Sequence, residues 1–245
     1  MNSNTNKSIG LVLASALLVS GVALLVNFWE PLSAIDHAIS QSIQGLRGDR
    51  LDVIMIVVTS MADTHVLVVA DVLIVALLIA TGHRRLALAS GFLLLGCAGI
   101  VQSIKWLLQR SRPMAELYDG VSAFSFPSGH ATNASAMLLV LLCLAHYSLT
   151  RPVRKAVMSI LLAIALLIGG SRIYLQAHWP SDIVAGYIVA LFTAALSSLL
   201  LSSHSHRLHP RIFWASLACW ISVGSIYTFL RFQDQLPLYW LQLAE

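Results

Sequence analysis

Charged residues are scarce in this sequence. Only 11% of its 245 residues are Asp, Glu, Lys or Arg, whereas soluble domains contain about 25%. Hydrophobic residues make up 58% of the chain. This composition excludes an ordinary soluble domain and predicts a polytopic membrane protein. The net charge of +4 therefore bears on membrane topology, and because no basic run contains interleaved aromatic residues, we expect no binding to nucleic acid.

Cysteine is also rare, which argues against a disulfide framework. The three cysteines lie far apart in the sequence, each inside an apolar run, as is typical of small buried hydrophobic side chains. No CxxC or HExxH motif occurs, so the sequence predicts neither a metal site nor a cofactor. The cysteines are Cys97, Cys143 and Cys219.

Long apolar runs predict an all-α bundle of membrane-spanning helices within a single membrane domain covering residues 1–245. The first run is long for a signal peptide, and no Ala-x-Ala site follows it, so a retained span is favoured. Residues 51–62 are also apolar but stop at Asp63, which fits either an interfacial segment or the tilted start of the second span. The predicted spans are 9–28, 65–81, 86–108, 128–144, 156–170, 183–202 and 212–230.

Two features depart from simple apolar spans. Asp71 lies inside the second predicted span, where it is either buried and hydrogen-bonded or part of a proton or ion path. Residues 30–50 form an amphipathic segment, because its apolar side chains recur at three- and four-residue spacing, and this predicts a helix lying in the membrane interface. Those side chains are Leu32, Ile35, Ile39, Ile43 and Leu46.

Basic residues are divided unevenly between the two ends of the predicted bundle. Because Lys and Arg accumulate in cytoplasmic loops, the more basic end is predicted to be cytoplasmic. That end also contains His204, His206 and His209; no carboxylate or Cys accompanies them, so a solvated turn is favoured over a metal site. The cations at this end are Lys7, Arg84, Arg85, Arg151, Arg154, Lys155, Arg207 and Arg211. Apart from the motif residues below, the other end has Arg47, Arg50, Arg110 and Arg231.

The first polar cluster lies at the end of the third predicted span. Lys105 and Arg112 are seven positions apart, so on a helix they would point the same way, about 10 Å apart along its axis. Pro113 disfavours helical geometry at the preceding residue and ends the span there. Two cations on one face repel unless an anion lies between them. Interfacial cations at an ordinary helix end are an equally good explanation.

The second cluster, residues 126–130, opens the fourth predicted span. Free backbone N–H groups at a helix start, together with the Ser128 hydroxyl, suit a phosphate-like oxyanion. Gly129 allows the backbone to approach a ligand closely. His130 lies in the first turn, from which it could donate a proton. A plain helix start with a serine cap explains the same residues.

The third cluster, residues 171–182, lies between two apolar runs. If a helix starts near Pro180, the four-residue spacing brings Asp182 and His178 together. A carboxylate that accepts from one imidazole nitrogen leaves the other nitrogen free to attack. Arg172 supplies a planar, permanently charged donor for an oxyanion. The alternative is a polar loop between helices with a helix cap.

By the predicted span count, all three clusters reach the same, non-cytoplasmic end of the bundle. Together they indicate recognition of a multiply charged oxyanion beside a histidine nucleophile, as in a phosphate monoester or diphosphate terminus. In sequence and spacing the clusters resemble the three signature motifs of the type 2 phosphatidic acid phosphatase (PAP2) superfamily, in the same order. The resembling residues are Lys105, Arg112-Pro113, Pro127-Ser128-Gly129-His130, Ser171-Arg172, His178 and Asp182.

This resemblance implies a metal-independent phosphatase with six core spans, so either the first or the last predicted span is an addition. We place the core at about residues 30–202 and expect 212–230 to be the additional span. The resemblance implies that His178 attacks phosphorus to form a phosphohistidine, that Asp182 orients His178, and that His130 protonates the leaving oxygen and then activates water. It also implies that the phosphoryl oxygens are held by Lys105, Arg112, Ser128, Gly129 and Arg172.

The expected substrate is a lipid phosphate, and the expected location is a bacterial inner membrane with the site facing the periplasm. Similar proteins act on undecaprenyl diphosphate, which we favour, or on phosphatidylglycerol phosphate, phosphatidic acid or lipid A. The segment 114–126 is short for a substrate-selecting lid. Alternatives are a lipid phosphotransferase and a non-catalytic lipid-binding or transport protein, for which Asp71 is the supporting feature. Vanadate-dependent haloperoxidases share the motifs, but they resemble soluble proteins.

Overall fold

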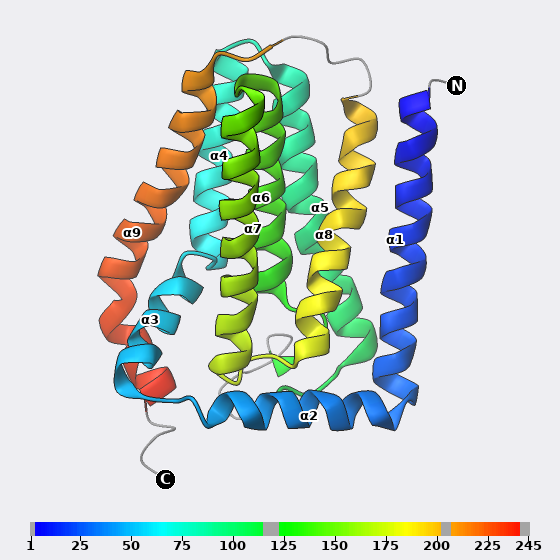
Figure 1. The fold of residues 1–245 in the computed structure, drawn as a ribbon, viewed down its shortest axis with the longest axis vertical. Helices are drawn as coiled ribbons and strands as arrows, with labels where there is room; N and C mark the ends of the chain where they lie inside the picture. The colour runs from blue at the N-terminus through cyan, green and yellow to red at the C-terminus, as the bar shows by residue number, and fades with distance from the viewer. Residues whose placement is uncertain (1–2, 115–122, 202–206, 241–245) are drawn as a thin grey trace.

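The computed structural model describes residues 3–114, 123–201 and 207–240. Seven helical segments in this part of the chain are long and apolar enough to cross a membrane, as the hydropathy pattern predicts, so the chain is an all-α, multi-pass membrane protein (Figure 1). The helices are α1 (Ser3–Phe28), α2 (Glu30–Gln44), α3 (Asp49–Ser60), α4 (Thr64–Ala80), α5 (Arg84–Leu108), α6 (Gly129–Ser148), α7 (Arg151–Tyr174), α8 (Pro180–Leu200) and α9 (Pro210–Trp240).

The apolar residues 51–62 form a short helix of their own that leads into the second span. The break between α3 and α4 follows from Asp63, whose carboxylate caps α4 by accepting the backbone N–H of His65 at 2.9 Å. In Figure 1, α3 is inclined relative to α4. Together α3 and α4 make one continuous candidate span, Asp49–Ala80.

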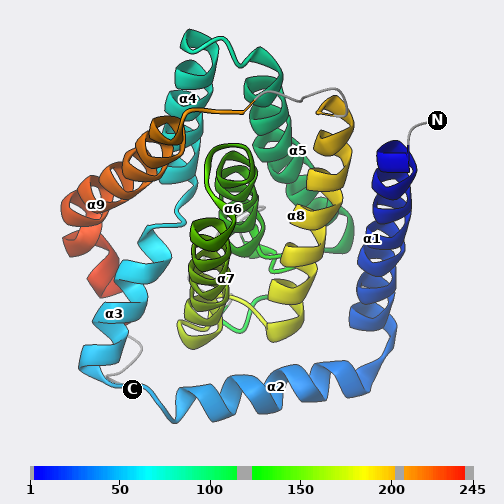
Figure 2. The same ribbon diagram turned by 45° about the horizontal axis from the view of Figure 1, so that its top comes forward.

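The central helix of the bundle is α6, which packs against α4, α5, α7, α8 and α9 (Figure 2). Its first half is rich in Ala, Ser and Thr, and small side chains let neighbouring helices approach closely within a membrane. Gly186 of α8 is one such contact: a Cβ there would lie 2.9 Å from the Thr132 hydroxyl and 3.0 Å from the Ser128 carbonyl oxygen. The two motif-bearing helix starts are therefore held against each other.

The amphipathic segment forms a helix, but this helix ends at Gln44 rather than continuing to residue 50. Figure 1 shows α2 lying across one end of the bundle, nearly at right angles to the long helices. Its buried residues are polar, Asp36 and Ser40, whereas Ile35 and Ile39 are 48% and 40% exposed. The packing of α2 onto the bundle therefore includes polar contacts in addition to the partly buried Leu32 and Ile43.

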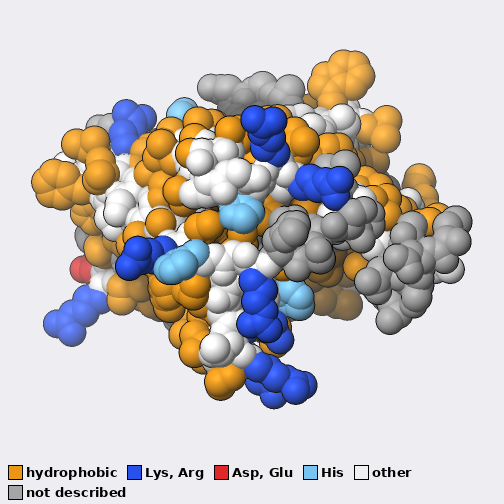
Figure 3. Space-filling model, turned by 90° about the horizontal axis from the view of Figure 1, so that it is seen from above, with side chains coloured by type: hydrophobic (Ala, Val, Ile, Leu, Met, Phe, Trp, Pro, Cys, Tyr) orange, Lys and Arg blue, Asp and Glu red, His pale blue; other side chains and the backbone are white. Residues whose placement is uncertain are grey.

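The end of the bundle opposite α2 is rich in cations, as predicted, and Figure 3 shows Lys and Arg side chains scattered over it. Its assignment to the cytoplasmic side stays a prediction. His204 and His206 lie outside the described residues, and His209 is exposed. The exposed cations at this end include Arg84, Arg85, Arg151, Lys155, Arg207 and Arg211.

Candidate active site

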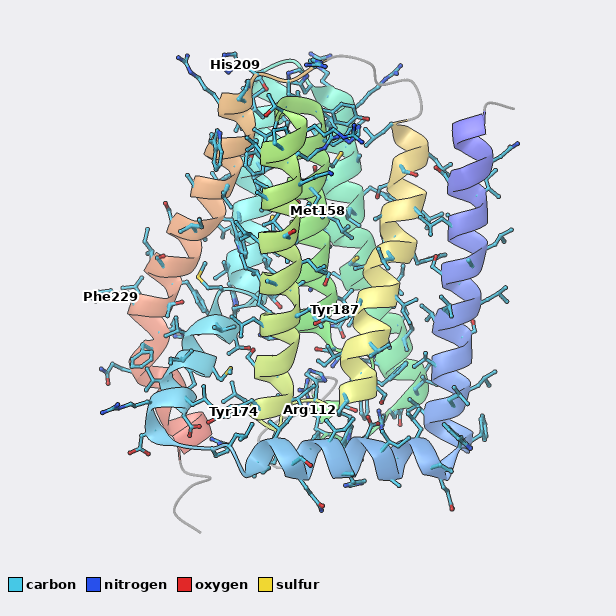
Figure 4. The ribbon with its side chains drawn as sticks, viewed as in Figure 1. Arg112, Met158, Tyr174, Tyr187, His209 and Phe229 are labelled. Atoms are coloured by element: carbon cyan, nitrogen blue, oxygen red, sulfur yellow. The ribbon has the colours of Figure 1, made fainter. Side chains whose placement is uncertain are left out.

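A cavity of about 280 Å³ lies at the end of the bundle that α2 crosses. Figure 4 labels Arg112, whose side chain lies between α2 and the nearby ends of α7 and α8. Residues from all three sequence clusters line this cavity, so the fold brings them together as predicted. Its lining comprises Thr64, Ala98, Val101, Gln102, Lys105, Arg112, Gly129, His130, Asn133, Arg172 and His178.

The structure brings His178 and Asp182 close together, as their four-residue spacing predicts, but the contact is longer than a hydrogen bond. Because α8 begins at Pro180, Asp182 lies in its first turn, and its Oδ2 is 3.5 Å from His178 Nδ1. Among the described residues, Nδ1 has no hydrogen-bond partner. Both side chains are buried, with residue exposures of 1% and 0%. In this arrangement the carboxylate acts on the imidazole mainly through its charge.

Arg112 determines which nitrogen of His178 presents its lone pair. Arg112 Nη1 donates to the Ala177 carbonyl at 2.6 Å and lies 3.1 Å from His178 Nε2. A guanidinium has only donors, so Nε2 faces it as the acceptor and the ring proton resides on Nδ1. The Nδ1–H then faces Asp182, and the Nε2 lone pair is directed at Arg112, which lines the cavity together with His178.

The surroundings of His178 favour the neutral form of its imidazole. Burial lowers the pKa of His178 well below its ordinary value of 6.5, and the charges of Arg112 and Arg172 lower it further. A neutral imidazole retains the lone pair that a nucleophile needs.

The prediction that Lys105 and Arg112 lie two turns apart on one helix is wrong. The helix α5 ends before Arg112, and Gln109 adopts a left-handed φ of 48°. Pro113 disfavours helical geometry at the preceding residue, so Arg112 continues in an extended segment. The two cations nevertheless line the same cavity, and the Lys105 ammonium donates to the Phe124 carbonyl.

The third motif cation, Arg172, comes from the last turn of α7 and is only 2% exposed. Its Nη1 donates to the Thr59 hydroxyl of α3 at 2.9 Å. Lys105 and Arg112 are also buried, at 5% and 8% exposure. Three buried cations around one cavity repel one another, so this cavity strongly favours an anion.

The start of α6 contributes Gly129 and His130 to the cavity. Ser128 is fully buried and caps the helix, and its Oγ accepts the N–H of Ala131 at 3.4 Å. Since this cavity is not lined by Ser128, its direct contact with a phosphoryl oxygen stays a prediction. The backbone N–H of Ser128 donates to the Asp182 carbonyl at 3.0 Å, which joins the second and third clusters.

Comparison with known proteins assigns the chain to a family. The sequence model described as "PAP2 superfamily" matches residues 86–205, a range that contains all three clusters. The crystal structure titled as the first transmembrane PAP2 type phosphatidylglycerolphosphate phosphatase from Bacillus subtilis matches with a TM-score of 0.68 and 25% identity, covering 79% of this chain and 97% of that one. The chain belongs to the PAP2 superfamily.

Several curated PAP2-like relatives match over a shorter region. Phosphatidylglycerophosphatase B of Bacillus subtilis is 34% identical over 90 residues, which is 36% of this chain and 44% of the relative. Undecaprenyl-diphosphatase of Sulfolobus acidocaldarius is 35% identical over 74 residues, which is 30% of this chain and 32% of the relative. Lipid A 4'-phosphatase of Bacteroides thetaiotaomicron is 33% identical over 90 residues, which is 36% of this chain and 35% of the relative. Each match spans less than half the length of the curated relative.

The sequence analysis does not single out Arg110, which is not a motif residue and is counted only among the cations at this end of the bundle. Its Nη1 donates to Asp182 Oδ1 at 2.7 Å and to Ser181 Oγ at 2.8 Å, and its Nη2 donates to Asp36 Oδ2 at 2.7 Å. One guanidinium thus joins two buried carboxylates. The local signal, a third cation between Lys105 and Arg112, does not reveal these partners.

The sequence analysis also does not single out Asp36 of α2, because the amphipathic pattern of that helix concerns only its apolar side chains. Asp36 accepts the N–H and the hydroxyl of Ser181 at 2.9 and 2.5 Å. Further along α2, Ser40 accepts from Gln176 at 2.9 Å, and Gln44 donates to the Tyr174 carbonyl at 3.2 Å. The three α2 residues recur every four positions and therefore share one helix face. That face binds the segment that contains His178.

The segment 114–126, which is short for a substrate-selecting lid, lies mostly outside the described residues, because 115–122 are not described. Its last residues lie at the site: Ser111 pairs with Phe124, and Ser125 Oγ donates to the Ser111 carbonyl at 3.0 Å. These contacts tie the strand-like stretch after α5 to the start of α6.

Proposed function

We propose that this protein is an integral-membrane lipid phosphatase that works without a metal ion and forms a phosphohistidine at His178. The observation that carries the proposal is the placement of His178, whose Nε2 lies 3.1 Å from Arg112 in the wall of a cavity lined by three buried cations. Membership of the PAP2 superfamily supports the same reaction class.

In the first step, His178 Nε2 attacks phosphorus and the bond from phosphorus to the leaving oxygen breaks. His130, at the cavity wall, donates a proton to that oxygen, so the lipid leaves as a neutral alcohol or as a shorter phosphate. The imidazole of the intermediate is cationic, and the carboxylate of Asp182 stabilises this charge from 3.5 Å away. Lys105, Arg112 and Arg172 stabilise the charge that develops on the phosphoryl oxygens.

In the second step, His130 is neutral and accepts a proton from water while the water oxygen attacks phosphorus. The bond between phosphorus and Nε2 breaks, inorganic phosphate leaves, and His178 returns to its neutral form with a proton on Nδ1. His130 must therefore be protonated in the first step and neutral in the second, which gives the reaction a pH optimum. Fixed cations supply the charge neutralisation that a metal ion provides elsewhere.

The substrate of this reaction is a lipid carrying a phosphate monoester or diphosphate terminus. The proposal is supported by the position of the cavity at one end of a membrane-spanning bundle, where a headgroup would lie with its tail among the helices. Phosphatidylglycerol phosphate, undecaprenyl diphosphate, phosphatidic acid and lipid A are the substrate types to test. The basic opposite end favours an extracytoplasmic site, as in a bacterial inner membrane.

The proposal is tested by measuring phosphate release from these lipids by purified protein in detergent with EDTA present. We expect release from at least one lipid, inhibition by vanadate as a phosphoryl mimic, and loss of release in His178→Ala. His209→Ala is the matched control, because this histidine is exposed at the other end of the bundle.

Three results would contradict the proposal. Substantial release by His178→Ala would exclude the nucleophile. Loss of release in EDTA that a divalent ion restores would exclude a metal-independent site. If no lipid yields phosphate, a phosphotransferase that needs an acceptor, or a non-catalytic lipid-binding protein, becomes the better explanation, and transfer of labelled phosphate to added alcohols separates these two.

A further inference from the structure

A second cavity, of about 440 Å³, lies between α4 and α5 and is almost entirely apolar. Its walls include Val68, Val72 and Leu95, which are 52%, 61% and 74% exposed and therefore face the surroundings of the bundle. Because α4 and α5 are candidate membrane spans, these surroundings are lipid. The cavity is thus a groove on the lipid-facing side.

This groove adjoins the candidate active site. Thr64, Ala98 and Asn133 line both cavities, so they form the boundary between the two. For a lipid whose phosphate occupies the active site, the groove is the neighbouring apolar space for the rest of the molecule. This position favours the leaving group of the substrate as the occupant.

Two buried polar side chains lie in this apolar groove. Asp71 is 8% exposed and Asn133 is 9% exposed. Asp71 Oδ1 and Asn133 Oδ1 have no hydrogen-bond partner among the described residues. Buried polar atoms are nearly always hydrogen-bonded, because leaving them without a partner costs free energy. An ionisable group inside a membrane span indicates a functional site for the same reason.

Asn133 lines both cavities, whereas Asp71 lines only the groove and lies further along its helix from the candidate active site. Asp71 is seven residues along α4 from Thr64, about 10 Å along the helix axis. Asn133 is four residues along α6 from Gly129, about 6 Å along its axis. A ligand group that meets both oxygens is therefore part of the leaving group close to the phosphate rather than the end of a long tail.

We propose that Asp71 and Asn133 form a subsite that accepts hydrogen bonds from a hydroxyl or amide N–H in the leaving group of the lipid. This inference rests on the proposed phosphatase function and narrows its substrate class. It favours lipid phosphates with a free glycerol or sugar hydroxyl, or an acyl amide, next to the phosphate. The polar pair thus provides a direct role for the intramembrane aspartate.

The same chemistry disfavours two other substrate types. A prenyl chain has no N–H or O–H group, so bound undecaprenyl diphosphate would leave both oxygens without a partner. Phosphatidic acid presents ester carbonyls, which accept but do not donate. A site built to bind a substrate hydroxyl discriminates strongly against an analogue that lacks it, because its own buried polar groups then stay unpaired.

The test compares two substrates that differ by one group: lysophosphatidic acid, with its free central hydroxyl, and the analogue with hydrogen in that position. We expect the wild-type protein to favour the hydroxyl substrate by at least about tenfold in kcat/KM. In the double variant Asp71→Leu/Asn133→Leu, we expect the ratio to fall below about twofold. Leucine removes the unpartnered oxygens, so the variant should have a melting temperature no lower than that of the wild type.

Ser135→Ala is the matched control. Ser135 also lies on α6, is 8% exposed, and its Oγ has no partner among the described residues. It lines a different cavity, against α7 and α8, so its substitution should leave the substrate ratio unchanged.

Equal kcat/KM for the two substrates, with release that still depends on His178, would overturn the subsite and leave the phosphatase proposal standing. A preference that persists in the double variant would likewise overturn it. Absence of His178-dependent release from both substrates and from the wider lipid panel would overturn the phosphatase proposal and the subsite with it.

Discussion

His178 owes its proposed reactivity to burial among cations. Its imidazole is 1% exposed, and Arg112 approaches Nε2 to 3.1 Å. A protonated ring in this position would have lost its water and would be repelled by neighbouring charges, so the neutral form is favoured. In the proposed reaction, an entering phosphate dianion would neutralise the cations, and Arg112 would exchange the imidazole for a phosphoryl oxygen as its acceptor.

The acid–base behaviour of His178 provides a test at the residue scale. Because burial and neighbouring cations lower its pKa, His178 should remain neutral as the pH falls through 6.5 and should accept a proton only below that value. Nuclear magnetic resonance of the histidine-labelled protein without substrate measures this titration, and the signal absent from His178→Gln identifies the residue. A midpoint at or above 6.5 would contradict the arrangement of charges described above.

Asp182 accepts hydrogen bonds from other donors, which explains its distance of 3.5 Å from His178 Nδ1. Its Oδ1 accepts from Arg110, and its Oδ2 accepts the backbone N–H of Trp179 at 2.9 Å. These contacts fix the carboxylate in the first turn of α8. The negative charge next to His178 therefore depends on how far Arg110 neutralises it.

The helix α2 affects the site through that balance of charge. Asp36 shares Arg110 with Asp182, so the three side chains together have one net negative charge when all are ionised. Without Asp36, Arg110 would pair with Asp182 alone and weaken the stabilisation of a cationic phosphohistidine. We therefore expect Asp36 to be a positioning residue that acts through Arg110.

We expect Asp36→Asn to lower kcat about tenfold and to leave KM nearly unchanged. The reason is that its effect falls on the charge of Asp182 rather than on the ligands of the phosphate. In an Arg110→Gln background, the same substitution should cause little further loss, because the interaction that it removes is already absent. Steady-state kinetics of the two single variants and the double variant measure this coupling.

Gln44→Ala is the control for Asp36, since it removes an uncharged α2 contact with the Tyr174 carbonyl. If Gln44→Ala and Asp36→Asn lowered kcat equally, Asp36 would serve only to dock α2. Additive losses in the Asp36 and Arg110 variants would also count against the shared guanidinium.

The close packing of α8 on α6 provides a second test at the element scale. In Gly186→Ala, the new Cβ would meet the Ser128 carbonyl oxygen at 3.0 Å, so one helix must shift at a cost of about 1–3 kcal/mol. We expect a lower melting temperature in detergent and reduced activity, because the start of α6 lines the cavity. Gly170→Ala is the matched control, since its Cβ would meet nothing within 4 Å and should be neutral or stabilising.

The two ends of the whole molecule differ in chemistry. One end has α2 and the cavity, and the other has exposed cations in the loops between the spans. If the basic end is cytoplasmic, the lipid headgroup is processed on the opposite side of the membrane.

Reporter fusions test this orientation in a bacterial host. Alkaline phosphatase needs disulfides and is active only in an oxidising compartment. Fused after Arg47, at the end that α2 crosses, it should be active; fused after Thr81, at the basic end, it should be inactive. The reverse pattern would place the candidate site in the cytoplasm and contradict the proposed localisation.

The sequence by itself determined the spans and the end at which the motifs meet. In lipid, the backbone polar groups must form hydrogen bonds within the segment and the side chains must be apolar, so long apolar runs predict helices. The number of membrane crossings then decides which loops lie on the same side. The spacing of His178 and Asp182 also predicted that they lie close together, because a four-residue separation at a helix start is a local property of the sequence.

Only the tertiary structure decided which groups hold Asp182 and where Arg112 lies. Asp36 and Ser181 are 145 positions apart, and Asp36 and Arg110 are 74 apart, so these contacts exist only because α2 crosses the bundle beside α8. No local periodicity in the sequence predicts such contacts. Likewise, Asp71 and Asn133 became a pair in one groove only through the packing of α4 on α6. Contacts between distant segments depend on packing, which the local sequence pattern does not specify.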